Sequence, residues 1–333
     1  MHINSTLPKK ILAWYDNSKR KLPWRVSKKS PKKLYYRLLS EFMLQQTQVK
    51  TVIPYFNNFT KKFKTLKDLS KSSEKEILKM WEGLGYYRRA RNLLACSKKL
   101  VKEHGSRLPN SLKKIKKLPG IGDYTGNALL GLVYNKPTLA VDGNVKRVFS
   151  RILNKKENKI NFENLIEKNK KNFFKTNRNA DFVEAMMEFG ALICKPKDPN
   201  CLTCCLKKTC KYSKSKNKIR SSKRKMIRKN YNIFCYINKK KQIALTKNNK
   251  VGFLKNFYLP TMIETKNSFN NQKWKFLKNY QNPISNLKLN INLYYKFANK
   301  IPQSHNWYSL DKNKEFIPSF TKKIFRQVST LFE

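Results

Sequence analysis

The stretch LPGIGDYTGNALLGL, residues 118–132, places two glycines two positions apart between segments that favour helix. The preceding residues SLKKIKKL, 111–118, have helical spacing, and GNALLGL, 126–132, starts another helix. Gly120 and Gly122 indicate a tight turn that ordinary side chains would obstruct. The stretch therefore predicts a helix–hairpin–helix.

Such a hairpin is suited to holding an anion. The turn points backbone N–H groups outward at the start of the second helix, where an anion can bind. A helix–hairpin–helix binds a DNA phosphate in this way, independently of the base sequence. An ordinary turn between two helices with glycine caps is the alternative.

The charge of the chain supports a polyanionic partner. Its 333 residues carry 74 Lys and Arg against 20 Asp and Glu, a formal net charge of +54. A field of that size favours nucleic acid as the partner. Part of the excess follows from a composition rich in Lys, Asn and Ile, as an AT-rich genome produces, so charge alone does not identify the target.

The spacing of apolar residues predicts helices through most of the first 193 residues. In 66–84 it predicts two helices, the second capped by Ser72 or Ser73. Further helices are expected at 162–174 and 180–193. We find no secretory signal and no apolar run of membrane-spanning length, which indicates a cytoplasmic protein.

The character of the chain changes after the helical body of about 210 residues. Residues 207–229 hold 12 Lys and Arg and no acid, as in a solvated linker or a tether that follows a DNA strand. Strands are then expected at 231–238, 241–246 and 286–297, and an amphipathic helix at 320–332. The last hundred residues therefore predict a small α+β domain.

Two carboxylates are candidates for catalysis. Glu41 lies in an apolar run beside Leu38 and Phe42, whereas Asp142 lies in a polar loop. An acid in an apolar pocket has a raised pKa and can donate a proton, while a second, wetter carboxylate stays ionised and stabilises a cation. That pair suits cleavage of a glycosidic bond. A solvated helix residue and a helix cap are the alternatives, and spacing does not show that the two face each other.

Five cysteines lie in CKPKDPNCLTCCLKKTC, residues 194–210. The gaps between Cys194, Cys201, Cys204 and Cys210 are six, two and five residues, with Cys205 as an extra thiol. Structural disulfides are rare in the cytosol. Zinc and an iron–sulfur cluster use similar thiolate ligands, so the motif alone leaves both open.

Several motifs in order resemble one family. They are LPWR at 22–25, SEFMLQQTQVKTVIPYF at 40–56, WEGLGYYRRARNL at 81–93, LPGIG at 118–122, VDGNVKR at 141–147 and the cysteine spacing. Together they resemble the MutY-type adenine DNA glycosylases of the helix–hairpin–helix superfamily, strongly over residues 7–210 and weakly over 230–333.

The resemblance implies a mainly α fold: a two-lobed glycosylase body with an iron–sulfur loop, followed by a small α+β Nudix-like domain. The implied parts are an iron–sulfur lobe of 1–24 and 133–212, a six-helix lobe of 25–132, a basic linker of 213–230 and a lesion-recognition domain of 231–333. The implied partner is double-stranded DNA, bound by a monomer associated with a bacterial-type nucleoid.

The resemblance also implies an activity, the excision of adenine mispaired with 8-oxoguanine or guanine after the nucleotide is flipped out. In it, Glu41 protonates the adenine and later activates water, Asp142 stabilises the sugar cation, and Tyr124 and Asn144 support the site. Gln46 and Tyr86 are implied as wedges in the duplex, and Gly120 and Gly122 as the DNA-binding hairpin. Arg25, in a motif of the adenine pocket, and Glu188 are implied as further site residues. The implied ligands of one [4Fe–4S] cluster are Cys194, Cys201, Cys204 and Cys210. Cys205 stands where relatives often have proline, and a small loop shift would let it replace Cys204.

One position separates related enzymes. Endonuclease III-like enzymes carry a nucleophilic lysine about where Tyr124 stands, and a tyrosine cannot form a Schiff base. An essentially monofunctional glycosylase is expected, with Lys146 able to give weak lyase chemistry. The alternatives are an endonuclease III-like glycosylase and AP lyase for oxidised pyrimidines, and a non-enzymatic iron–sulfur protein that binds DNA.

The C-terminal domain matches the family only loosely. VGFLKNFYLP, 251–260, has Phe253 where tryptophan is usual, and Ile284-Ser285-Asn286 stands in place of the Phe-Ser-His recognition loop. Ser285 could keep a hydrogen bond to 8-oxoguanine. We find no Nudix-box glutamates, so pyrophosphate hydrolysis is not expected.

Overall fold

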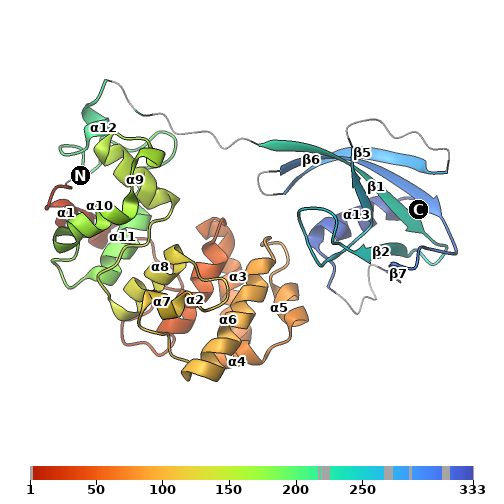
Figure 1. Ribbon diagram of the computed structural model, residues 1–333, viewed down its shortest axis with the longest axis horizontal. Helices are drawn as coiled ribbons and strands as arrows, with labels where there is room; N and C mark the ends of the chain where they lie inside the picture. Colours follow the sequence, from red (N-terminus) through yellow and green to blue (C-terminus); the bar gives the residue numbers. More distant parts are fainter. Residues whose placement is uncertain are drawn as a thin grey trace. The chain divides into compact units, whose positions relative to one another are not determined.

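A computed structural model describes residues 3–216, 219, 226–265, 273–284, 287–309 and 316–332. The chain divides into two compact units, Met1–Met80 with Arg88–Ser221 and Trp81–Tyr87 with Ser222–Glu333. Figure 1 labels the helices of the first unit, and the C-terminal helix and most strands of the second. This is the predicted combination of a helical body with a C-terminal α+β domain.

The first unit is helical. Its described elements are α1 (Leu7–Ser18), α2 (Lys33–Leu44), α3 (Val49–Lys62), α4 (Leu66–Lys71), α5 (Glu74–Met80), α6 (Arg88–His104), α7 (Leu112–Ile115), α8 (Asp123–Tyr134), α9 (Gly143–Leu153), the 3-10 helix η1 (Glu157–Lys159), α10 (Phe162–Phe173), α11 (Asn179–Leu192) and α12 (Lys211–Lys214). The predicted pair at 66–84 is confirmed as α4 and α5, and Ser73 caps α5 by accepting a hydrogen bond from the Glu76 N–H at 3.2 Å.

The helices of this unit pack in two groups, one around α11 and one around α2. Helix α11 lies against α1, α8 and α9, and these helices contribute to one apolar core. Helix α2 packs against α3, α6 and α8. Helix α8, the second helix of the hairpin, thus touches both α2, which carries Glu41, and α11, which packs against α9. The predicted lobe boundaries stay a prediction.

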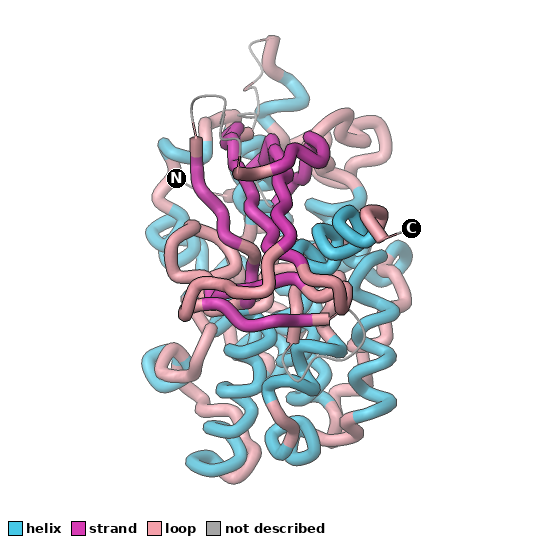
Figure 2. Tube along the Cα trace, turned by 90° about the vertical axis from the view of Figure 1, so that its right-hand side faces the viewer, coloured by secondary structure: helices cyan, strands magenta, loops and turns pink. Residues whose placement is uncertain are grey.

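The second unit holds a mixed sheet. Its described strands are β1 (Ile227–Ile237), β2 (Ile243–Lys247), β3 (Tyr258–Leu259), β4 (Thr261–Glu264), β5 (Lys275–Ile284), β6 (Leu287–Phe297) and β7 (His305–Tyr308). The order is β3-β2-β1-β6-β5, with β4 paired to β1 and β7 to β2; the strands are magenta in Figure 2. Strands β1 and β6 run parallel, from Ile227 opposite Leu287 to Ile237 opposite Phe297.

Helix α13 (Ser319–Ser329) supplies the apolar cover of this sheet. Its Ile324, Phe325 and Val328 join a core with alternate residues of β1, including Ile233 and Cys235. The predicted strands and C-terminal helix are confirmed, while β1 begins at Ile227, inside the segment predicted as linker. Strands β3, β4, β5 and β7 were not predicted. Cys96 and Cys235 are both fully buried.

Candidate functional site

Glu41 is buried within α2, with only 4% of its surface exposed. Its neighbours Leu38, Leu39 and Phe42 are also buried, and its Oε2 atom has no hydrogen-bond partner. Burial raises the pKa of Glu41 to about 7, although the charge of Arg37 and the Tyr124 hydroxyl each lower it. A carboxyl with that pKa holds its proton in a large fraction of molecules at neutral pH, as a general acid requires.

Asp142 forms the N-cap of α9. Its Oδ1 accepts a hydrogen bond from the Val145 N–H at 2.7 Å, and its Oδ2 accepts one from Asn144 Nδ2 at 2.8 Å. Asp142 is half-buried and so lies in a wetter setting than the buried Glu41, as expected, although burial still raises its pKa. These hydrogen bonds and the charge of Arg147 lower that pKa. The two carboxylates therefore differ in their hydrogen bonding, because Asp142 is bonded through both oxygens and Glu41 leaves one bare.

Tyr124 on α8 joins the two carboxylates. Burial raises the pKa of Tyr124, and the charges of Glu41 and Asp142 raise it further. The charge of Asp142 also raises the pKa of Glu41. The Tyr124 hydroxyl itself donates to Met187 Sδ at 3.3 Å. Side chains from α2, α8 and the start of α9 thus lie within electrostatic reach of one another, as two carboxylates acting on one sugar must.

Arg147, which sequence reasoning missed, fixes the start of α9. Its Nη2 donates to Asn144 Oδ1 and to the Gly190 carbonyl, both at 2.7 Å, and its Nε donates to the Cys194 carbonyl at 2.7 Å. Helix α11 approaches closely here, since a Cβ at Gly190 would lie 2.6 Å from Asn144 Cβ. Arg147 therefore links Asn144, which donates a hydrogen bond to Asp142, to Cys194, the first cysteine of the motif.

A buried ionic network lies beside the acid. Arg25 is 3.2 Å from Glu188 Oε2 through Nη2 and 3.2 Å from Glu184 Oε2 through Nε. Arg20 donates to Glu188 through Nε at 2.8 Å, and Arg37 pairs with Glu184. The cations lower the pKa of Glu188 although burial opposes them. Sequence reasoning missed Glu184 and Arg37; the available signal was two acids four residues apart in an apolar helix, which need buried partners.

The hairpin connects α7 to α8. Gly120 has a φ of +77°, and Gly122 is the N-cap of α8 in an extended conformation. A Cβ at Gly120 would lie 2.6 Å from Asn92 Cβ and 2.8 Å from Phe42 Cε1. The Lys116–Asp123 ion pair, at 2.6 Å, spans the turn. The turn thus has the tight backbone predicted from its two glycines.

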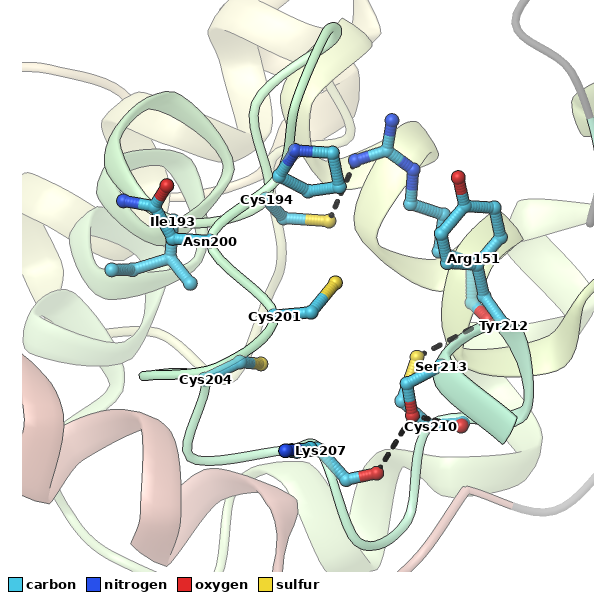
Figure 3. A pocket seen from close by; sticks show the side chains of 11 residues that line it. Arg151, Ile193, Cys194, Asn200, Cys201, Cys204, Lys207, Cys210, Tyr212 and Ser213 are labelled. Atoms are coloured by element: carbon cyan, nitrogen blue, oxygen red, sulfur yellow. Dashed lines mark hydrogen bonds between the residues drawn. The ribbon is translucent and has the colours of Figure 1, made fainter. Parts of the chain in front are cut away.

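Four cysteine thiols line one cavity. In Figure 3 the sulfurs of Cys194, Cys201, Cys204 and Cys210 face a common space. Arg151 donates from Nη1 to Cys194 Sγ at 3.4 Å. Burial raises the pKa of the Cys194 thiol, and it raises that of Cys204 to about 12.

The extra thiol of Cys205 does not belong to the lining of this cavity. It packs against the core that includes α1, and the charge of Lys10 on that helix acts on it. Over the described part of the chain, no three Cys, His, Asp or Glu side chains converge tightly enough to hold one metal ion. Four thiols around one cavity are the donor set of an iron–sulfur cluster, and zinc uses the same kind of ligands.

Comparisons with known proteins decide the family. The model of the HhH-GPD superfamily of base excision DNA repair proteins matches residues 39–172. An adenine DNA glycosylase of Buchnera aphidicola subsp. Baizongia pistaciae is 37% identical over 90% of this chain and 90% of its own length. The chain belongs to the adenine DNA glycosylase family. A second member, from Buchnera aphidicola subsp. Schizaphis graminum, is 33% identical over 94% of this chain and 96% of its own length.

Two solved structures share the fold over part of this chain. A thermostable thymine-DNA glycosylase has a TM-score of 0.56 and 29% identity, covering 63% of this chain and 95% of its own. An endonuclease III–DNA complex, at 20% identity and a TM-score of 0.51, covers 64% of this chain and 98% of its own and shares the fold. In the part of the chain that the structure describes, no helix has the length and apolar character needed to cross a membrane.

Two further predicted site residues, Gln46 and Tyr86, have positive φ angles. Gln46 and Tyr86 have φ values of 59° and 50°, which non-glycine residues rarely adopt. Tyr86 is 41% exposed whereas Tyr87 is buried, and Gln46 is exposed. Arg89 binds the carbonyls of Phe42 and Met43 just before Gln46. Strain of this kind concentrates at functional positions, so their role as wedges stays a supported prediction.

The C-terminal site of this adenine DNA glycosylase family member is described only in part. Ile284 ends β5, whereas Ser285 and Asn286 lie outside the described residues. Phe253 packs within its unit, with ring centroids 5.7 Å from Tyr231 and 5.9 Å from Phe320. The contact of Ser285 with 8-oxoguanine stays a prediction.

In the helical unit, Lys146 is exposed and its Nζ lies 5.7 Å from the Phe162 ring.

The hairpin permits a sharp stability test. We expect Gly120→Ala to lower the free energy of unfolding by about 2–4 kcal/mol, because the new Cβ overlaps Asn92 and Phe42 at a positive φ. Gly122→Ala is the matched control, since its Cβ would meet nothing within 4 Å, and its effect should stay within about 1 kcal/mol. Urea unfolding of both variants measures the difference. Equal stabilities would show that the close approach at position 120 is wrong.

Proposed function

We propose that the chain flips adenine out of duplex DNA in which it is mispaired with 8-oxoguanine or guanine, and hydrolyses its N-glycosidic bond with acid assistance. The buried carboxyl of Glu41, with a pKa raised to about 7 beside Asp142, carries this proposal. Membership of the adenine DNA glycosylase family supports the choice of base and makes the enzyme a hydrolase of base-excision repair.

The first step breaks the bond between adenine and the sugar. Protonated Glu41 donates its proton to a ring nitrogen of adenine, so the base leaves as a neutral molecule with the bonding electron pair. The sugar left behind is an oxocarbenium-like cation. The carboxylate of Asp142 stabilises that cation, held in place by the Val145 N–H and Asn144.

The second step adds water to the sugar. Glu41 is now a carboxylate and takes a proton from the attacking water, whose oxygen bonds to the anomeric carbon. Glu41 thereby regains the proton it gave away, so the cycle closes. Because the first step needs protonated Glu41, excision should slow as the pH rises through about 7.

The remaining predicted residues have supporting roles. Tyr124 contributes its hydroxyl next to Glu41, and Arg25, held by Glu184 and Glu188, supplies a fixed cation beside the site. Tyr124 cannot form the Schiff base that strand cleavage by a lyase needs. We therefore propose a glycosylase that leaves the abasic strand intact, acting as a monomer; its nucleoid association stays a prediction.

One [4Fe–4S] cluster fits the cavity of four thiols, with Cys194, Cys201, Cys204 and Cys210 as its ligands. When bound, the cluster supplies structural cross-linking of the loop. Arg151 and Arg147 bind the same loop through the Lys195 and Cys194 carbonyls. The folded loop presents lysines to phosphates, and these are Lys195, Lys197, Lys207, Lys208 and Lys211.

A single-turnover assay tests the proposed function. Duplexes with adenine opposite 8-oxoguanine, guanine, cytosine or thymine are incubated with excess enzyme, and abasic sites are then cut with alkali. We expect cutting only after alkali, and only opposite 8-oxoguanine and guanine. Borohydride trapping on a thymine glycol duplex would instead establish the endonuclease III-like alternative.

A further inference from the structure

An arginine lies one helical turn before the candidate acid. Arg37 and Glu41 are four residues apart on α2, so both side chains project from the same face. Only 8% of Arg37 is exposed, against 4% of Glu41. A buried arginine this near a carboxyl normally pairs with it and holds it ionised, which would remove its proton.

Arg37 makes its ion pair with another carboxylate instead. Its Nη1 pairs with Glu184 on α11, which also lies 3.2 Å from Arg25 Nε and accepts a hydrogen bond from the Tyr15 hydroxyl. Arg37 Nε and Glu41 Oε2 are both buried without a hydrogen-bond partner. A donor and an acceptor one turn apart on one helix are thus left unpaired, while the arginine points its charge at α11.

We propose that Glu184 holds Arg37 away from Glu41, so that the pair Arg37–Glu184 sets the protonation of the acid. Both are positioning residues, because they act through Glu41. The inference rests on the proposed acid role of Glu41. In this arrangement Glu184 takes up the charge of Arg37 that would otherwise make Glu41 an ion pair.

The other groups around Glu41 support this arrangement. Tyr124 faces it from α8, and Asp142 acts on it from the start of α9. On α6, Arg89 is bound to main-chain carbonyls at the end of α2. The buried Phe56 of α3 contacts the ring of Tyr36 on α2. The charge of Arg37 lowers the pKa of Glu41 and that of Glu184 raises it, so the two work in opposite directions.

The test is the pH dependence of single-turnover adenine excision. In Glu184→Gln, Arg37 loses its partner and turns to Glu41, so the basic limb of the profile should move down by about one pH unit or more. In Arg37→Met that limb should move up, because a cation is lost. The double variant should lack the downward movement, and Arg37→Lys, which keeps the charge, should retain the wild-type limb.

The outcomes separate this inference from its alternatives. A structural role alone would lower the rate equally at every pH, and that result in both single variants would overturn the proposal. A downward movement that persists in the double variant would also overturn it, since Arg37 would then be uninvolved. Circular dichroism melts establish that each variant is folded, and Arg37→Met decides the matter if Glu184→Gln is not. Wild-type protein without excision at any pH would instead refute the proposed function.

Discussion

Glu41→Gln is expected to lose nearly all adenine excision while still binding mismatched DNA. The amide keeps the shape of the carboxyl but cannot give a proton, and loss of general acid catalysis costs about 10²–10⁴-fold in rate. Because Glu41 also activates water in the proposed second step, we expect the upper end of that range. Single-turnover excision opposite 8-oxoguanine measures the rate, and a gel-shift assay measures the binding.

A matched control for that variant is Glu103→Gln. Glu103 is exposed at the end of α6, where it lies 3.8 Å from Lys99 Nζ, and its carboxylate has no role in the proposed reaction. The control should excise adenine at the wild-type rate. A Glu41→Gln protein that worked as fast as this control would remove the acid from the mechanism.

Cys204→Ser is expected to lose the iron–sulfur chromophore. The Cys204 sulfur faces the cavity shared with three other cysteines, and a serine hydroxyl is a poor replacement for a soft thiolate ligand. We expect the brown colour and most of the bound iron to be absent, and DNA affinity to fall with the unfolded loop. Visible absorption and iron and zinc analysis of the purified protein measure this.

Cys205→Ser is the control next to it in the chain. Its thiol packs against the core at α1 and not into the cavity, so this variant should keep both colour and iron. Colour retained in Cys204→Ser but lost in Cys205→Ser would mean that the loop shifts and Cys205 is the true ligand. Zinc in place of iron in the wild-type protein would contradict the cluster itself.

Much of the fold was predictable because the spacing of apolar residues and the capping residues are local features of the sequence. Helical spacing predicted α4, α5, α10 and α11, and a Ser at the right place predicted the cap of α5. Strand β5 was missed for a physical reason: as the edge of the sheet it is mostly solvated, and its sequence KFLKNYQNPI lacks the apolar run of a buried strand.

The site was predictable only as far as single residues reveal chemistry. An acid inside an apolar run marked Glu41, and the structure does bury it. The raised pKa of Asp142 was not predictable, because the burial that causes it comes from elements distant in sequence. Arg37 and Glu184 were missed for the same reason, since their partnership joins residues 147 positions apart and no local pattern connects them.

Gly190 shows how a harmless-looking change could silence this enzyme. The chain has only ten glycines and is rich in Lys, Asn and Ile. At position 190 an added methyl group would overlap the Asn144 side chain and lie 3.1 Å from the Asn144 backbone. Alanine normally favours a helix. Here it would displace Asn144, which donates a hydrogen bond to Asp142, so a missense change outside the proposed catalytic groups is expected to act as a mutator allele.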